Sequence, residues 1–356
     1  MTGSRASASA DAAPGAAAVR RVLVCSVNWI GDAIMAMPAV QRWRERHPGD
    51  RLVVLARPPV DALWRLHAAP DEVWPMPRRA RAVAAAAGRA RRARFDEAVI
   101  LPNSPRSALV PWLAGIPRRV GLRRGARDLL LTSAVRPPAG PGREHQAWEY
   151  VALLCPEAAD RPLPAPRLAL PPDARRAAEA LLEGLPRPRV ALMPGAARGP
   201  SKRWPDDHFA RVARDLSAAP GCGIVALGAA SERDACARSL PPAGRNLAGR
   251  TDLAAWAAVL AACDLAVSND SGGAHLAAAV GTPVVVVFGA TDPARTAPLG
   301  PGVDAVAADV PRRGRDIARS DARAAAALRA LEPGRVVERA RARLARGRPA
   351  AGERDA

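Results

Sequence analysis

Runs of consecutive apolar residues, each followed by a turn and a helical pattern, recur along this chain. In the first half the runs cover 21–25 and 51–56, and a helical stretch from 33 to 46 separates them. Strand, turn, helix and strand at this spacing predict a βαβ unit and therefore a parallel sheet. A further strand is predicted over 98–101, and it ends in the polar turn 102–104.

The same pattern restarts after the proline-rich stretch 161–166. The second half is predicted to hold strands at 189–193, 223–227, 265–267 and 284–288, with helices near 206–218, 253–262 and 274–280. Strands that are apolar throughout are buried on both faces, as in parallel sheets covered by helices. The fold class is therefore α/β, with two Rossmann-like, doubly wound parallel-sheet domains, and the cleft between them is the expected ligand site.

The pattern also suggests boundaries. We expect a disordered leader at 1–19, an N-terminal domain at 20–165, a C-terminal domain at 175–318, a helical segment at 319–346 and a disordered tail at 347–356. The leader lacks the apolar core of a secretory signal, and no apolar run is long enough to span a bilayer. Five widely spaced cysteines without a C-x-x-C pair predict neither a zinc site nor a disulfide framework. Together these features predict a cytoplasmic protein.

A net charge of +19 makes nucleic acid, anionic membrane and acidic substrates candidate partners. Aromatic residues amount to only 3%, so stacking platforms for single-stranded nucleic acid are scarce, and we expect no nucleic-acid partner. Part of the excess lies in residues 311–356, with thirteen arginines against six acidic residues. Such basicity can favour peripheral contact with an anionic inner membrane. The basic clusters 89–94 and 118–127 are candidates for contact with acceptor phosphates or lipid.

Lys202 is the single lysine, against fifty-two arginines, and it lies in a Gly/Pro loop directly after a predicted strand. An ammonium is a compact point charge, whereas a guanidinium is a planar fork, so the two are not equivalent where a tight loop holds a phosphate. Gly195 and Gly199 allow the bends of this loop. The loop does not match the P-loop pattern G-x-x-x-x-G-K-[ST], which argues against a P-loop kinase. Chance retention of one lysine in an arginine-biased sequence is the alternative.

Residues 268–275, Ser-Asn-Asp-Ser-Gly-Gly-Ala-His, connect a predicted strand to an Ala-rich helix. Adjacent glycines let the backbone approach a ligand, and the free amides of a helix start favour an anion. Ser271 can cap the helix and also donate to a phosphate oxygen. A positive His275 near the helix start is unfavourable unless an anion compensates. A capped helix without a ligand is the alternative.

Asp32 follows the turn Trp29-Ile30-Gly31 at the end of the first strand, where it would face the cleft. A carboxylate opposite a phosphate-binding half suits a general base that acts on an acceptor hydroxyl. The structural alternative is that Asp32 caps the helix that follows it.

Taken together and in their order along the chain, these segments resemble the ADP-heptose:lipopolysaccharide heptosyltransferases, which form glycosyltransferase family 9. The marks are Asn28–Asp32, Leu101–Ser104, Ala114–Pro117, Pro194–Ala196, Gly199–Pro205, Ser268–Gly272 and Phe288–Pro293. The Lys-Arg-Trp-Pro form is more similar to the heptosyltransferase II branch. The resemblance implies the GT-B fold, an inverting transfer, an ADP-heptose donor on the second half and a lipid-linked core acceptor on the first.

By the same resemblance, Asp32 matches the catalytic base and Lys202 a lysine at the donor phosphates. The other donor-site residues implied are Gly195, Thr251 near the adenine, Asp270 at the sugar, Ser271, Gly272 and Gly273 at the diphosphate, and His275 close to it. Lys202 and the helix start can replace a divalent ion, so neither a metal nor another cofactor is expected. Family members often carry a cysteine cluster that 310–322 lacks, which marks this chain as divergent.

Two other functions are consistent with the sequence. One is a GT-B transferase for another nucleotide sugar or glycan acceptor, since the acceptor half does not settle the substrate. The other is a non-catalytic basic protein that binds membrane or nucleic acid, which the presence of Asp32 and Lys202 disfavours.

Overall fold

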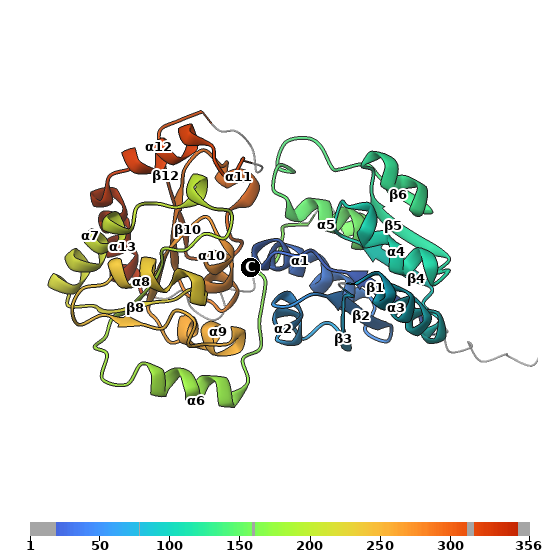
Figure 1. Cartoon of the computed structure of the whole chain (residues 1–356), viewed down its shortest axis with the longest axis horizontal. Coiled ribbons are helices and arrows are strands. Elements are labelled where there is room, and N and C mark those ends of the chain that lie inside the picture. Colours follow the sequence, from blue (N-terminus) through green and yellow to red (C-terminus); the bar gives the residue numbers. More distant parts are fainter. Residues whose placement is uncertain (1–18, 78, 159–160, 312–316, 348–356) are drawn as a thin grey trace, which may run out of the picture.

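The computed structural model describes residues 19–77, 79–158, 161–311 and 317–347. The expected leader and tail lie almost entirely outside the described residues, as does the middle of 310–322. In the described part of the chain, two six-stranded parallel sheets are present, one in each half (Figure 1). The predicted α/β class with two doubly wound sheets is therefore confirmed.

The first half is built on β1 (Arg21–Cys25), β2 (Arg51–Ala56), β3 (Glu72–Pro75), β4 (Glu97–Ile100), β5 (Arg118–Leu122) and β6 (Ser133–Val135). Its helices are α1 (Ile30–Arg46), α2 (Val60–Arg65), α3 (Ala80–Ala93), α4 (Pro105–Leu113) and α5 (Ala147–Leu154), with 3₁₀ turns η1 (Gly125–Leu130) and η2 (Pro156–Ala158). The strand order is β3-β2-β1-β4-β5-β6. The order reverses between β1 and β4, so a crevice opens there at the carboxyl ends of the strands.

The second half repeats this plan with β7 (Arg189–Met193), β8 (Gly223–Ala226), β9 (Arg245–Asn246), β10 (Leu265–Asn269), β11 (Val284–Phe288) and β12 (Val303–Ala307). Its helices are α6 (Pro172–Leu181), α7 (Asp206–Ala218), α8 (Arg233–Arg238), α9 (Leu253–Ala261), α10 (Gly272–Ala279), α11 (Pro293–Thr296), α12 (Ala322–Ala330) and α13 (Pro333–Arg346), with η3 (Pro200–Lys202) and η4 (Ala230–Glu232). The order β12-β11-β10-β7-β8-β9 places its crevice between β7 and β10.

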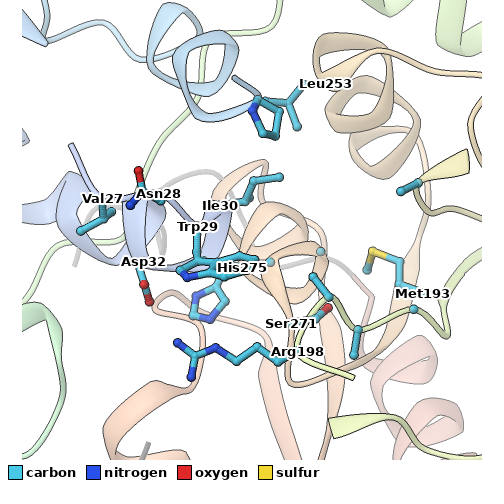
Figure 2. Close-up of a pocket in the computed structure, with 18 of the residues that line it drawn as sticks. Val27, Asn28, Trp29, Ile30, Asp32, Met193, Arg198, Leu253, Ser271 and His275 are labelled. Carbon is cyan, nitrogen blue, oxygen red and sulfur yellow. The ribbon is translucent and has the colours of Figure 1, made fainter. Parts of the chain in front are cut away.

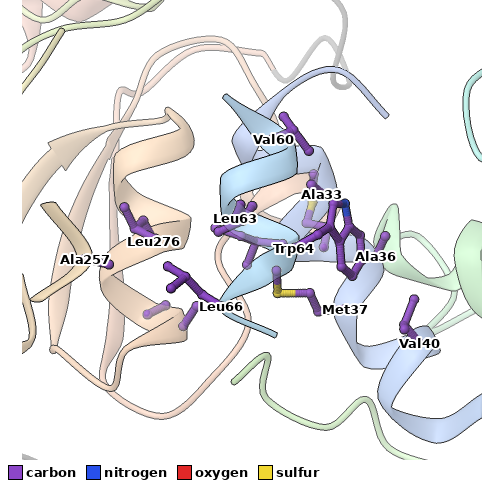
Figure 3. Packing of buried hydrophobic residues seen from close by; sticks show 14 of the residues in the cluster. Ala33, Ala36, Met37, Val40, Val60, Leu63, Trp64, Leu66, Ala257 and Leu276 are labelled. Carbon is purple, nitrogen blue, oxygen red and sulfur yellow. The ribbon is translucent and has the colours of Figure 1, made fainter. Parts of the chain in front are cut away.

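Helices from both halves share one apolar core (Figure 3). Leu63 of α2 and Leu66, the residue directly after this helix, belong to the same buried cluster as Ala257 of α9 and Leu276 of α10. Because apolar burial stabilises in proportion to the area removed from water, this shared cluster holds the two halves together.

The last two helices pack on the second half. Val336, Val337 and Ala340 of α13 are buried in the cluster that includes Val285 and Val287 of β11. α12 and α13 are two separate helices, since α12 ends at Ala330 and α13 begins at Pro333.

Candidate functional site

The loops at the two strand-order reversals line one cavity of about 1200 Å³ between the halves. The first half contributes the loops after β1 and β4, and the second half contributes those after β7 and β10. Figure 2 shows Trp29, Asp32, Ser271 and His275 around this cavity. All the site residues predicted from the sequence, from Asp32 to His275, line it.

Two helices begin at this cavity from opposite halves. A Cβ on Gly272, the first residue of α10, would lie 3.0 Å from Cβ of Ile30, the first residue of α1. A Cβ on Gly31 would lie 3.0 Å from Cδ2 of His275. The absence of side chains at Gly31 and Gly272 therefore lets the two helix starts meet. Their positive ends and unpaired amides together favour an anion in the cavity.

Lys202 and Asp270 form a buried ion pair on the second half. Nζ of Lys202 donates to Oδ2 of Asp270 at 2.6 Å, and the side chains are only 11% and 7% exposed. The hydroxyl of Thr291 donates to the same oxygen at 2.8 Å. The loop after β7 and the loop after β10 are thereby fixed to each other, with an ammonium at the wall of the cavity.

Asn269 was not identified from the sequence, yet it fastens the same two loops. Its Nδ2 donates to the carbonyl of Pro194 at 2.7 Å, and its Oδ1 accepts from the backbone N–H of Trp204 at 2.9 Å. Asn269 is fully buried, so these hydrogen bonds exchange little with water. The position of Asn269 at the carboxyl end of β10 was the signal available in the sequence.

Gly195 leaves room for a second carboxylate that sequence reasoning missed. A Cβ on Gly195 would overlap the carboxylate of Glu232, which accepts from the backbone N–H of Ala229 at 2.8 Å. Glu232 lies after β8, the second strand of this half, and lines the cavity. In dinucleotide-binding folds an acidic residue in this part of the fold accepts from ribose hydroxyls. Thr251 lines the cavity on the same half.

Ser271 does not cap the helix as expected. It occupies the N-cap position of α10 but makes no side-chain capping bond, and its Oγ lies 3.3 Å from Oγ of Ser268. Its hydroxyl and the amides of Gly272 and Gly273 at the helix start therefore remain on the cavity wall.

Asp32 is the third residue of α1, and Trp29 is the N-cap, so the capping alternative is wrong. Nε2 of Gln146 donates to Oδ1 of Asp32 at 3.3 Å and to the hydroxyl of Tyr150 at 2.6 Å. The backbone N–H of Gln146 donates to the carbonyl of Arg295 in the other half at 3.0 Å. Gln146, which the sequence did not indicate, thus connects the Asp32 carboxylate to the contact between the halves.

His275 is buried at 4% exposure, and burial lowers its pKa to about 4, with smaller influences from Asp270, His145 and Lys202. The imidazole is therefore neutral near pH 7, and the expected conflict between a positive His275 and the helix start does not arise. Its Nδ1 has no hydrogen-bond partner among the described residues.

This neutral histidine predicts a pH dependence of stability. Between pH 6.5 and 4 the unfolded chain binds a proton at His275 that the folded chain excludes, so the free energy of unfolding falls by about 3 kcal/mol over this window. His275→Gln should remove this component, which chemical denaturation at several pH values would measure. An identical pH slope in the variant would contradict the assignment.

Across the described ranges, no three His, Cys, Asp or Glu side chains gather closely enough to hold a metal ion. Lys202 and Arg198 are cationic side chains that line the cavity. The guanidinium carbon of Arg198 lies 5.9 Å from the centre of the Trp29 ring.

The chain is similar to proteins of known activity. Residues 84–318 match glycosyltransferase family 9 (heptosyltransferase). Lipopolysaccharide heptosyltransferase 2 of Escherichia coli K12 is 33% identical over 304 residues, which cover 78% of this chain and 85% of that protein. Lipooligosaccharide heptosyltransferase 2 of Haemophilus influenzae is 30% identical over 303 residues, or 78% and 86% of the two chains.

The fold agrees with this similarity. The solved structure of E. coli ADP-heptose lps heptosyltransferase II superposes with a TM-score of 0.79 and 29% sequence identity, and it covers 92% of this chain and 99% of that one. The match to glycosyltransferase family 9 spans more than half of the chain. The cavity lies at the carboxyl ends of the strands, where both sheets reverse their strand order. This chain therefore belongs to glycosyltransferase family 9, the heptosyltransferase family, and has its GT-B fold.

Proposed function

We propose that this protein transfers heptose from ADP-heptose to a hydroxyl of the lipopolysaccharide inner core, as a heptosyltransferase II-like enzyme. The observation that carries this proposal is the cavity itself. Its wall from the second half presents Lys202 and the start of α10, and its wall from the first half presents Asp32. The names of the E. coli and H. influenzae relatives specify the heptose and the lipopolysaccharide or lipooligosaccharide acceptor.

The donor would bind to the second half. The diphosphate would lie at the start of α10, where the amides of Gly272 and Gly273 and the hydroxyl of Ser271 donate to its oxygens. Lys202 would exchange its bond to Asp270 for a phosphate oxygen, which frees the Asp270 carboxylate for hydroxyls of the sugar. Glu232 would accept from the ribose hydroxyls, and Thr251 would lie near the adenine.

The transfer would be a single displacement. Asp32 takes the proton of the acceptor hydroxyl, whose oxygen bonds to the anomeric carbon as the bond from that carbon to the β-phosphate oxygen breaks. ADP then leaves with the negative charge, which Lys202 and the helix start stabilise. Because the base and the leaving group belong to opposite walls, attack comes from the face opposite ADP and inverts the configuration.

We further propose that this transfer needs no divalent metal ion. A metal would neutralise the departing diphosphate, and here the buried ammonium of Lys202 and the converging starts of α1 and α10 are placed for the same task. None of the helices seen in the described residues has both the length and the apolar character to cross a bilayer. We propose a cytoplasmic enzyme that meets its lipid-linked acceptor at the membrane surface.

Transfer from ADP-heptose to heptosylated Kdo-lipid A, measured by mass spectrometry with and without EDTA, tests the proposed activity and its independence of a divalent metal ion. We expect a product heavier by one heptose and the same rate in EDTA. A rate that EDTA abolishes and Mg²⁺ restores would contradict the metal-free mechanism. Tight ADP binding without transfer would retain the donor site and point to another sugar or acceptor, which a panel of nucleotide sugars would identify.

A further inference from the structure

Exposed apolar side chains are concentrated on one part of the first half. Among the described residues, the large apolar side chains that are exposed are Val19, Trp29, Trp112, Leu113 and Leu129. Trp112 and Leu113 end α4, and Leu129 lies in η1, where it is 86% exposed. These two elements pack against each other.

A single guanidinium holds the ends of α4 and η1 together. Nε of Arg119 donates to the carbonyl of Leu130 at 2.8 Å, and its Nη1 donates to the carbonyl of Ile116, three residues beyond Leu113. Ile116 is in the core cluster beneath, and Leu130 packs against that cluster. Leu129 is therefore displayed on a rigid support beside the end of α4.

The surroundings of these apolar side chains are basic. Residues 101–136 contain seven arginines and a single acidic residue, Asp128. Arg119 and the buried Arg127 bind backbone carbonyls, so they serve the fold. Arg92 and Arg94, in contrast, are exposed at the end of α3, where Nη2 of the neighbouring Arg91 donates to the carbonyl of Leu113 at 2.7 Å.

We infer that this α4–η1 face, defined by Trp112, Leu113, Leu129, Arg92 and Arg94, docks on an anionic phospholipid surface. A tryptophan and leucines surrounded by arginines combine insertion at the headgroup level with attraction to negative lipid. A second copy of this chain is a weaker candidate for the occupant of the α4–η1 face. Two such basic faces, on molecules that each have a net charge of +19, would repel each other.

The position of the face suits the proposed lipid-linked acceptor, and in this respect the inference rests on the proposed function. Residues 102–104 line the cavity, and α4 begins directly after them at Pro105. Nine residues of helix span about 13 Å. One end of α4 therefore lies at the cavity and the other carries Trp112 and Leu113. In Figure 1, α4 lies on the part of the first half away from the second half, where a membrane would leave the donor side open.

Flotation of the full chain with vesicles tests the inference, with phosphatidylethanolamine plus phosphatidylglycerol compared with phosphatidylcholine alone. We expect binding to the anionic vesicles that high salt weakens. The triple change Trp112→Ser, Leu113→Ser and Leu129→Ser should lower the partition coefficient about tenfold or more. Arg92→Gln with Arg94→Gln should lower it severalfold.

Matched controls are Val19→Ser, which removes an exposed apolar side chain elsewhere, and Arg323→Gln with Arg329→Gln on α12. Both should bind vesicles as the wild type does. Unchanged thermal unfolding and ADP binding would show that the triple variant folds. Equal partitioning of wild type and triple variant, or no vesicle binding at all, would overturn the inference. So would a wild-type dimer in sedimentation that the triple variant converts to monomer without any vesicle effect.

Activity separates this inference from the proposed function. On a deacylated, water-soluble acceptor the triple variant should transfer as well as the wild type, whereas with acceptor embedded in anionic vesicles its kcat/KM should fall about tenfold. Vesicle binding lost in the triple variant, with no transfer by either protein, would support the docking face and reject the acceptor. An equal loss on both acceptors would assign the face to catalysis instead of docking.

Discussion

Asp32→Asn is expected to lower kcat for transfer by about 1000-fold, the range of a removed general base. The amide has nearly the same shape as the carboxylate but cannot take a proton from the acceptor hydroxyl. Affinity for ADP should stay unchanged, because the donor groups belong to the other half of the chain. Initial rates of transfer and calorimetric titration with ADP would measure the two effects separately.

The chain offers a matched control for this change. Asp61, at the start of α2, is another carboxylate from the first half that lines the same cavity. Asp61→Asn removes the same charge without touching the proposed base, so it should leave kcat close to the wild-type value. A variant with Asp32→Asn that keeps its rate, or one with Asp61→Asn that loses it, would show that the base has been assigned to the wrong residue.

Lys202→Met is expected to affect both stability and activity. It removes one partner of a buried ion pair and leaves Asp270 with the hydroxyl of Thr291, so the free energy of unfolding should fall by about 3 kcal/mol. It also removes a cation from the proposed diphosphate site, which should lower kcat by about 100-fold or more. Urea denaturation and transfer assays would measure the two losses.

A double variant separates the two effects. In Lys202→Met with Asp270→Asn no buried charge is left without a partner, so most of the lost stability should return. Transfer should stay low, because the diphosphate still lacks its ammonium. Recovery of activity together with stability would mean that Lys202 acts only through the fold.

Local pattern was sufficient for the central part of each sheet. The apolar runs of β1, β7, β10 and β11 are buried throughout their interior, and such runs read as parallel strands without further information. The predicted helix 206–218 agrees with α7, and the predicted helix 253–262 agrees with α9 to within one residue. The loops that carry Asp32, Lys202 and Asp270 could be placed at the carboxyl ends of strands for the same reason.

The outer strands could not be predicted in this way. β5 begins with two arginines, β9 is Arg245–Asn246 alone, and β6 has only partly buried residues. Such strands form because the adjacent strand of the sheet offers unpaired backbone N–H and C=O groups. The pattern of polar and apolar residues in the strand itself gives little indication of this pairing. The start of α10 was placed two residues late, because glycines at 272 and 273 weaken a helical pattern that the packing against α1 supports.

What the sequence by itself determined, then, is the class of fold, the two repeated halves and the residue types that reach the cavity. Only the tertiary structure decided which of them meet. Lys202 pairs with Asp270 across 68 positions, Gln146 reaches Asp32 across 114, and Gly31 adjoins His275 from the other half. Helix and strand patterns arise from neighbours within a few positions along the chain. Contacts across the cavity depend instead on how two separately wound sheets pack through α1, α2, α9 and α10, and no local pattern contains that information.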